Sequence, residues 1–261
     1  APFETAYMEG RTPNPCVVCN SEVKVEALVD IADASGTAWV ATGHYARVLA
    51  DQGKTILYRG KDREKEQSYF LHRLEPRHLS RLVFPLAEWT KTDARAAARA
   101  RGLPSREEPE SQEICFLSGG DYRSFLRSRK GAEIERPGDI VDQAGRRLGS
   151  HRGMHRFTIG QRRGLGVASS RPYYVLALRP RLNQVVVGRR EALLRLEVEA
   201  VDVVWTAGRP QGGRSRAEAQ IRYRHAAARG SFEILPRDRV RFVFDRAQPA
   251  VTPGQALVLY Q

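Results

Sequence analysis

The sequence lacks the features that mark membrane and secreted proteins. Its 261 residues contain no apolar run of about eighteen residues, the length that a transmembrane helix needs. Its first residues, Ala1–Glu4, show neither a basic leader nor an apolar signal core. It has only three cysteines, an odd number that does not build the disulfide framework of a small secreted domain. We therefore expect a cytoplasmic protein with no membrane partner, whose cysteines are reactive, metal-bound or buried.

Acidic residues are scarce relative to basic ones. The chain has 43 Lys and Arg against 30 Asp and Glu, a formal net charge of +13, and arginine makes most of the excess. A positive field attracts phosphates, and each phosphate that is neutralised releases counterions. Polyanions such as nucleic acids are therefore the expected partners, although an Ala- and Arg-rich composition can also reflect genomic base composition alone. The 41% hydrophobic content and the length predict an ordinary folded protein of about two domains.

Cys16 and Cys19 follow a turn rich in proline and asparagine, Thr12–Pro15. A helix is predicted to begin at Ser21 and to end at Gly36, because apolar residues in this segment are spaced as on one helix face. They are Val25, Leu28, Val29 and Ala32. Cys19 would then lie just ahead of the first helical amides, where the peptide dipoles favour an anion, so an activated thiol is predicted. The same Cys-x-x-Cys spacing is also typical of half a zinc site.

An apolar segment follows this helix. Ala38–Gly43 predicts a buried strand, and a helix followed by such a strand indicates a parallel α/β sheet. Ligands of such sheets lie beyond the carboxyl ends of the strands, where Gly43 and His44 fall. His44 is therefore expected either to face a nucleotide or to be an ordinary loop histidine. The charged connection 61–67, which leads into Ser68–Leu71, is either a solvated surface or a set of donors for a substrate.

The character of the chain changes within 121–137. Before this segment the sequence predicts a second helix after Thr90, which has capping spacing to Asp93, and places the third cysteine, Cys115, in an apolar patch. After it, short strands alternate with glycine turns. From Leu196 onward, alternating apolar and polar runs predict a small antiparallel barrel.

Arginines gather among aromatic residues in the part that follows the boundary. They are Arg152, Arg156, Arg162, Arg163, Arg171, Arg179 and Arg181, with Phe157, Tyr173 and Tyr174 between them. This mixture suits phosphate contacts and base stacking. Arg222–His225 is predicted as the most basic strand of the barrel, either an RNA contact or an exposed strand face.

Several segments together resemble the family of tRNA-specific 2-thiouridylases. They are Gly10–Asn20, Thr42–Arg47, Gln67–Leu71, Glu113–Phe116, Phe157–Gly166 and Thr252–Gln255, and they span nearly the whole chain in the order of the family. The resemblance implies ATP-dependent thiolation of the wobble uridine of tRNA through a cysteine persulfide. It implies a cysteine desulfurase or a sulfur-relay protein as the sulfur donor, and no metal beyond the magnesium that accompanies ATP.

The resemblance also implies the fold, an α/β part followed by all-β parts. Residues 1–120 would form part of a doubly wound ATP-binding domain of the adenine nucleotide alpha hydrolase type. Residues 121–192 would form a small central β domain that binds tRNA, and residues 193–261 a C-terminal β-barrel.

Residue roles are implied by motif match. Cys115 resembles the persulfide carrier, and Cys19 the nucleophile that attacks its sulfur and leaves a disulfide, which cellular reductant resets. The binding positions implied in the same way are Asn14, Pro15 and Cys16 for the target base, Gly43 for ATP, and Lys65, Glu66, Gln67, Arg222 and Tyr223 for tRNA.

The chain departs from the family pattern at two points. Some members carry an aspartate, proposed as an acid or base, where this chain has Cys16. The N-terminal phosphate loop of the family, Ser-Gly-Gly-x-Asp-Ser, is absent from the sequence. Because backbone amides of that loop hold the nucleotide phosphates, we expect this chain alone to bind ATP weakly and to be an incomplete, inactive enzyme.

Two other functions fit parts of the sequence. A non-catalytic RNA-binding protein, with Cys16, Cys19, Cys115 and His44 around one structural zinc, would explain the charge equally well. Chelators would remove that metal and unfold the protein. A thioredoxin-like reductase would also use a Cys-x-x-Cys, but here the motif follows a Pro-Asn-Pro turn rather than a strand.

Overall fold

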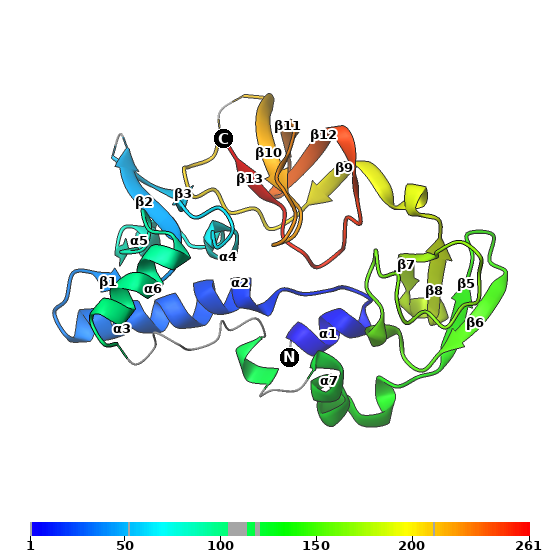
Figure 1. Ribbon diagram of the computed structural model, residues 1–261. Helices are drawn as coiled ribbons and strands as arrows, with labels where there is room; N and C mark the ends of the chain where they lie inside the picture. The colour runs from blue at the N-terminus through cyan, green and yellow to red at the C-terminus, as the bar shows by residue number, and fades with distance from the viewer. Residues whose placement is uncertain (1, 52, 104–113, 118–120, 211) are drawn as a thin grey trace. The chain divides into compact units, whose positions relative to one another are not determined.

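The structure is a computed structural model that describes residues 2–51, 53–103, 114–117, 121–210 and 212–261. The chain forms two compact units. We call residues 15–112 with 202–212 the α/β unit, and residues 1–14, 113–201 and 213–261 the β-rich unit. The prediction of an α/β part followed by all-β parts is confirmed (Figure 1), while the division into domains at residues 120 and 192 stays a prediction. None of the described helices is both long and apolar enough to cross a lipid bilayer.

The α/β unit begins with one continuous helical run (Figure 1). It consists of α2 (Pro15–Cys19), a π-helical stretch (Asn20–Lys24) and α3 (Val25–Ala34). The predicted start at Ser21 is therefore wrong, because proline suits the first helical position, where its missing N–H has no intrahelical partner in any case. Asn20 does not cap this helix, since its side-chain amide donates to the carbonyl of Phe70 at 3.3 Å. The helix ends before Gly36, which has a φ of 65°, as predicted.

The other elements of the α/β unit are short. They are β1 (Val40–Ala41), β2 (Ala46–Asp51), β3 (Lys54–Arg59), α4 (Ser68–Leu71), α5 (Pro76–Leu79), β4 (Leu82–Val83) and α6 (Lys91–Ala100). β1 and β4 pair in parallel, and β2 and β3 form an antiparallel hairpin. Buried Val25, Leu71 and Leu79 join α3, α4 and α5 in one core. The predicted cap of α6 is confirmed, because the amide of Asp93 donates to Thr90 Oγ1 at 3.1 Å.

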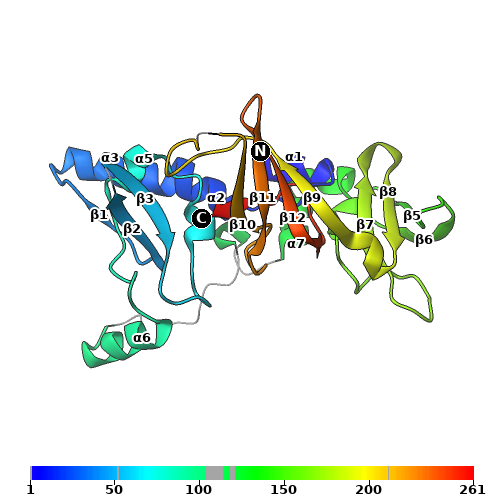
Figure 2. The ribbon, with the colours of Figure 1, turned by 90° about the horizontal axis from the view of Figure 1, so that it is seen from above.

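The β-rich unit contains two sheets, with strand orders β6-β5-β8-β7 and β13-β10-β11-β12-β9. Figure 2 shows β10, β11, β12 and β9 of the second sheet side by side. The first sheet consists of β5 (Gly138–Val141), β6 (Arg147–His151), β7 (Tyr174–Arg179) and β8 (Gln184–Gly188). The second consists of β9 (Leu194–Ala200), β10 (Arg214–Gln220), β11 (Ala228–Leu235), β12 (Arg239–Pro249) and β13 (Val258–Tyr260). Ile140, Val175 and Val185 are fully buried in the first sheet's core, and Phe232 and Phe242 are buried in the second sheet.

An aromatic cluster joins the start of the chain to the same unit. Phe3 and Tyr7, on α1 (Pro2–Met8), pack with buried Leu126 of α7 (Tyr122–Lys130). Tyr7 stacks on Tyr122 with ring centroids 5.0 Å apart. Removing these rings from water stabilises α7 against α1, within the segment where the sequence predicts a boundary.

Candidate functional site

Cys16 and Cys19 lie in the first turns of the helical run. Both side chains are half-buried, and none of the three cysteines forms a disulfide in the structure. Buried Val17 lies between them, and the Asn20–Phe70 hydrogen bond ties this end of the helix to α4. Cys19 closes α2 rather than preceding a helix, so the predicted reason for its activation, a place ahead of the first amides, is wrong. Cys16, one residue after Pro15, is the cysteine nearer those amides.

Gly43 and His44 follow the carboxyl end of β1, a strand in a parallel pair, as predicted. His44 is held within this loop, because its Nδ1 lies 2.9 Å from Thr42 Oγ1 and its ring meets the Phe84 ring edge-on at 6.1 Å. Burial, followed by the charge of Lys24, lowers the pKa of His44. The imidazole is therefore neutral at pH 7 and offers a hydrogen bond rather than a charge to a ligand.

The connection 61–67 is ordered by its own side chains. Asp62 Oδ1 accepts hydrogen bonds from the amides of Glu64 and Lys65, at 3.1 and 3.2 Å. The carboxylate of Glu66 accepts from the amide of Ser68 at the start of α4. Glu66 therefore shapes this connection through a backbone contact.

Gln67 joins this connection to the loop of Gly43. Its side-chain oxygen accepts a hydrogen bond from the backbone amide of Tyr45 at 3.0 Å. The backbone amide of Gln67 donates to the carbonyl of Tyr45 at 2.9 Å. The structure thus brings Gly43 and His44 together with the connection that contains Lys65. The sequence does not predict this pairing, because the two segments are far apart along the chain.

Gly43 and Gly60 differ in what a side chain would meet. Among the described atoms, a Cβ at Gly43 would approach only Leu86 Cδ1, at 3.9 Å, whereas one at Gly60 would lie 2.8 Å from the carbonyl oxygen of Tyr45. We expect Gly43→Ala to change the free energy of unfolding by less than about 0.5 kcal/mol. Gly60→Ala should lower it by about 1–3 kcal/mol, because the overlap is with backbone. Urea unfolding of both variants measures this difference, and equal losses would contradict it.

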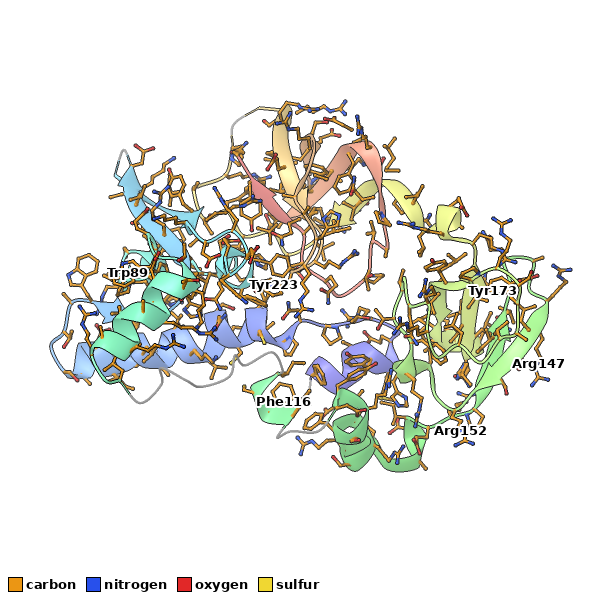
Figure 3. The ribbon with its side chains drawn as sticks, viewed as in Figure 1. Trp89, Phe116, Arg147, Arg152, Tyr173 and Tyr223 are labelled. Atoms are coloured by element: carbon orange, nitrogen blue, oxygen red, sulfur yellow. The ribbon has the colours of Figure 1, made fainter. Side chains whose placement is uncertain are left out.

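Cys115 lies in the β-rich unit, on a 3₁₀ turn at Cys115–Leu117. Its side chain is exposed. The next residue, Phe116, anchors the turn, with ring centroids 5.4 Å from Phe3 and 5.2 Å from Phe125 (Figure 3 labels Phe116). The thiol is thus accessible to solvent while the backbone that carries it is held by aromatic packing.

A turn near the C-terminus holds the segment that leads to Asn14. The amide of Thr12 donates to the carbonyl of Pro253 at 2.9 Å, and Gln255 Nε2 donates to the carbonyl of Thr12 at 2.7 Å. Gly254 has a φ of 92°, and a Cβ there would lie 2.9–3.0 Å from backbone atoms of Thr12. We call this contact the Thr12 clamp. Its only signal in the sequence is the glycine of the Thr-Pro-Gly-Gln turn.

Arg222 and Tyr223 lie just beyond β10, which ends at Gln220. The prediction of a strand at Arg222–His225 is wrong, because these residues form a turn: the amide of His225 donates to the carbonyl of Arg222 at 3.0 Å. Gln220 Nε2 also donates to the carbonyl of Tyr223, at 2.6 Å. Arg222 Nη1 donates to the carbonyl of Pro249 at 3.3 Å, so its guanidinium is partly engaged within the unit.

The predicted site residues divide between the units. The α/β unit holds Pro15, Cys16, Cys19, Gly43, Lys65, Glu66 and Gln67, and the β-rich unit holds Asn14, Cys115, Arg222 and Tyr223. Within the described ranges, no group of three or more His, Cys, Asp or Glu side chains is arranged to hold a metal ion.

Family models match consecutive parts of the chain. They are described as the tRNA methyl transferase HUP domain (residues 1–119), the tRNA methyl transferase PRC-barrel domain (123–189) and the aminomethyltransferase beta-barrel domain (195–261). The chain is also similar to proteins named tRNA-specific 2-thiouridylase MnmA. It is 46% identical to that of Carboxydothermus hydrogenoformans, over 99% of this chain and 71% of the relative. It is 47% identical to those of Desulforudis audaxviator and Sorangium cellulosum, over 100% of this chain and 76% and 68% of the relatives.

Proposed function

Since this chain belongs to the MnmA family of tRNA-specific 2-thiouridylases, we propose that it takes part in the cytoplasmic thiolation of tRNA, in which sulfur replaces the C2 oxygen of the wobble uridine, and that it supplies the sulfur-transfer cysteines while being inactive alone. A carbonyl oxygen is a poor leaving group. ATP, when bound with its magnesium, supplies the adenylation that makes this oxygen displaceable. The residues of this chain then have two tasks, to deliver sulfur and to release the thiolated base.

Cys115 carries the sulfur in this proposal. A cysteine desulfurase or sulfur-relay protein transfers a sulfane sulfur to the Cys115 thiolate, which becomes a persulfide. Its terminal sulfur attacks C2 of the activated uracil, and AMP leaves with the former oxygen. The Cys19 thiolate then attacks Cys115 Sγ, the bond between that sulfur and the transferred sulfur breaks, and the base leaves as the thiolated product. A cellular dithiol reduces the resulting Cys19–Cys115 disulfide.

The observation that carries this assignment is the setting of Cys115. A carrier must meet a bulky sulfur donor, which requires an exposed thiol, and must present its sulfur at a defined point, which requires an ordered backbone. Cys115 is exposed, and Phe116 packs on Phe3 and Phe125 beside it.

Two further observations support the binding assignments. Neither backbone conformation nor packing requires a glycine at Gly43, so the space there is consistent with close approach of ATP. Gln67 binds the backbone of Tyr45 next to this loop, so Lys65, Glu66 and Gln67 would form a tRNA contact beside the nucleotide. Arg222 and Tyr223 are proposed as a second tRNA contact, and Asn14, Pro15 and Cys16 as the segment that meets the target base.

The proposal is tested by loading sulfur without ATP or tRNA. The reduced protein is incubated with a cysteine desulfurase and cysteine, with and without a zinc chelator, and its intact mass and peptides are measured. We expect the mass of one sulfur atom to be added at Cys115, with no zinc released. No added sulfur, together with one zinc released per chain, would replace the proposal by the zinc-dependent RNA-binding protein.

A further inference from the structure

A cavity of about 420 Å³ lies in the β-rich unit, in the loop that precedes β7. Its walls include Arg162, Gly164, Gly166, Ser169, Arg171 and Tyr173. Tyr173, labelled in Figure 3, immediately precedes β7 of the four-stranded sheet. We call this loop, residues 162–173, the arginine loop. Arg162, Arg171 and Tyr173 belong to the arginine-rich stretch whose sequence suits phosphate contacts, but no residue of this loop has a role in the proposed function.

The arginine loop is held in place by packing on the sheet core and by hydrogen bonds where the loop begins. Leu165 is 7% exposed and packs in the sheet core with Met154 and Phe157. The side chain of Gln161 braces the entry, since its oxygen accepts from the amide of Thr158 at 3.1 Å and its nitrogen donates to the carbonyl of Arg163 at 3.0 Å. The cavity is therefore formed before any ligand binds, which reduces the entropy lost on binding.

Arg189 fixes the other end of the loop. Its Nη1 donates to the carbonyls of Arg171 and Pro172, at 2.5 and 3.2 Å, and its guanidinium lies 4.2 Å from the centre of the Tyr173 ring. The Arg189 guanidinium therefore adds a positive charge next to the Tyr173 ring. Its hydrogen bonds also fix the backbone of Arg171.

Among the residues that the structure describes, no carboxylate balances the positive charge of the cavity. Its lining includes no acidic residue, and in the described part of the chain neither Arg162 nor Arg171 forms an ion pair. Elsewhere in the same unit arginines are paired, Arg147 with Asp139 and Arg156 with Glu135, each at 2.8 Å. Unpaired arginines beside a polar cavity favour a bound anion, and guanidinium groups match phosphate oxygens in geometry.

The loop backbone offers further donors. Among the described residues, the amides of residues 164–168 donate to no protein acceptor. Gly164 and Gly166 have φ values of 72° and 66°, which turn the chain without side chains that would cover these amides. Successive amides left open in such turns form concave anion sites.

We propose that this cavity binds a backbone phosphate of the tRNA, with Arg162 and Arg171 as the charged contacts and the loop amides as neutral donors. The inference rests on the proposed function for its ligand. Arg162, Arg171 and the glycines are exposed, so the cavity opens along the surface and suits a phosphate on a continuing strand rather than an enclosed nucleotide.

The test compares Arg162→Ala, Arg171→Ala and the double variant with Arg147→Ala, which removes an arginine of the same sheet that is already paired with Asp139. Affinity for an unmodified tRNA transcript is measured over a range of salt concentrations. Each cavity variant should weaken binding roughly tenfold and reduce the slope of log K against log salt by about 0.7 to 0.9. Arg147→Ala should change the slope by much less, and the melting temperature and sulfur loading at Cys115 should be unchanged in all variants.

The outcomes separate this inference from the proposed function. Equal slopes in the wild type and the double variant, or an equal loss in Arg147→Ala, would overturn the phosphate site while leaving the function in place. Absence of sulfur loading in the wild type would overturn the function itself. A third arm titrates AMP and inorganic phosphate: AMP that binds the wild type but not the double variant, and leaves tRNA affinity unchanged, would show a mononucleotide site and refute the RNA contact, whereas competition of either anion with tRNA would support it.

Discussion

Cys115→Ser should abolish sulfur loading completely, while Cys19→Ser should load as much sulfur as the wild type. A serine hydroxyl cannot form a persulfide under these conditions, and Cys115 is the exposed thiol that the proposed function assigns to the carrier. In the proposed mechanism Cys19 reacts only after the sulfur has reached the base, so its thiol should not be needed for loading. Intact mass and peptide mapping after incubation with a cysteine desulfurase measure both variants.

Cys16→Ser serves as the matched control for this pair, because Cys16 lies on the same helical run as Cys19 and is also half-buried. It should load sulfur on Cys115 normally. A persulfide on Cys16 or Cys19 of the wild type would show that Cys115 is not the sulfur carrier. Full loading of Cys115→Ser would show the same. A Cys19–Cys115 disulfide in the oxidised wild type, absent from Cys19→Ser, would support the second step.

Gly254→Ala should be among the most destabilising single changes in the β-rich unit. Its φ of 92° strains any residue with a Cβ, and that Cβ would lie 2.9–3.0 Å from backbone atoms of Thr12. The overlap would also weaken the hydrogen bonds of the Thr12 clamp. We expect a loss of roughly 3–4 kcal/mol in the free energy of unfolding, measured by urea denaturation.

Gly145→Ala is the control for this prediction. Gly145 lies in the same unit and has a similar φ, 84°, but no atom of the residues that the structure describes lies within 4 Å of its added Cβ. It should lose only the cost of the left-handed conformation, roughly 1 kcal/mol. If both substitutions had the same effect, the clamp would contribute nothing beyond backbone strain. If Gly254→Ala weakened tRNA binding and Gly145→Ala did not, this would show that the clamp positions the segment before Asn14.

Local patterns predicted much of the fold. Short strands between glycine turns indicated the first sheet of the β-rich unit, alternation of apolar and polar residues from Leu196 onward indicated the second, and the Thr90–Asp93 spacing located the start of α6, because these signals depend on neighbours in sequence. The pattern does not locate the helix start, because a proline can either precede a helix or occupy its first position, and Pro15 does the latter. The turn at Arg222 was missed because its geometry depends on hydrogen bonds from Gln220 and His225, which a run of basic residues does not encode.

The candidate site was less predictable, since its contacts join distant segments. Motif resemblance supplied Cys19, Cys115 and Gly43 as separate positions, but no periodicity could have paired Gln67 with Tyr45. The role of Cys19 in the predicted disulfide likewise depends on the arrangement of two units, which a sequence pattern does not contain. Side chains that bind backbone atoms of remote loops are the kind of contact that only a structure reveals.

The Thr12 clamp also has a consequence for biosynthesis. The hydrogen bond from Gln255 reaches a residue 243 positions earlier in the chain, so it cannot form until the chain as far as Gln255 has left the ribosome. The helical run of Cys16 and Cys19 depends mainly on contacts within the α/β unit and can form much earlier during translation. We therefore expect a nascent chain to form the helix of Cys16 and Cys19 first and to fix the segment before Asn14 last. In a chain stalled before Gln255, this helix would be formed while Thr12 still lacked its hydrogen-bond partners near the C-terminus.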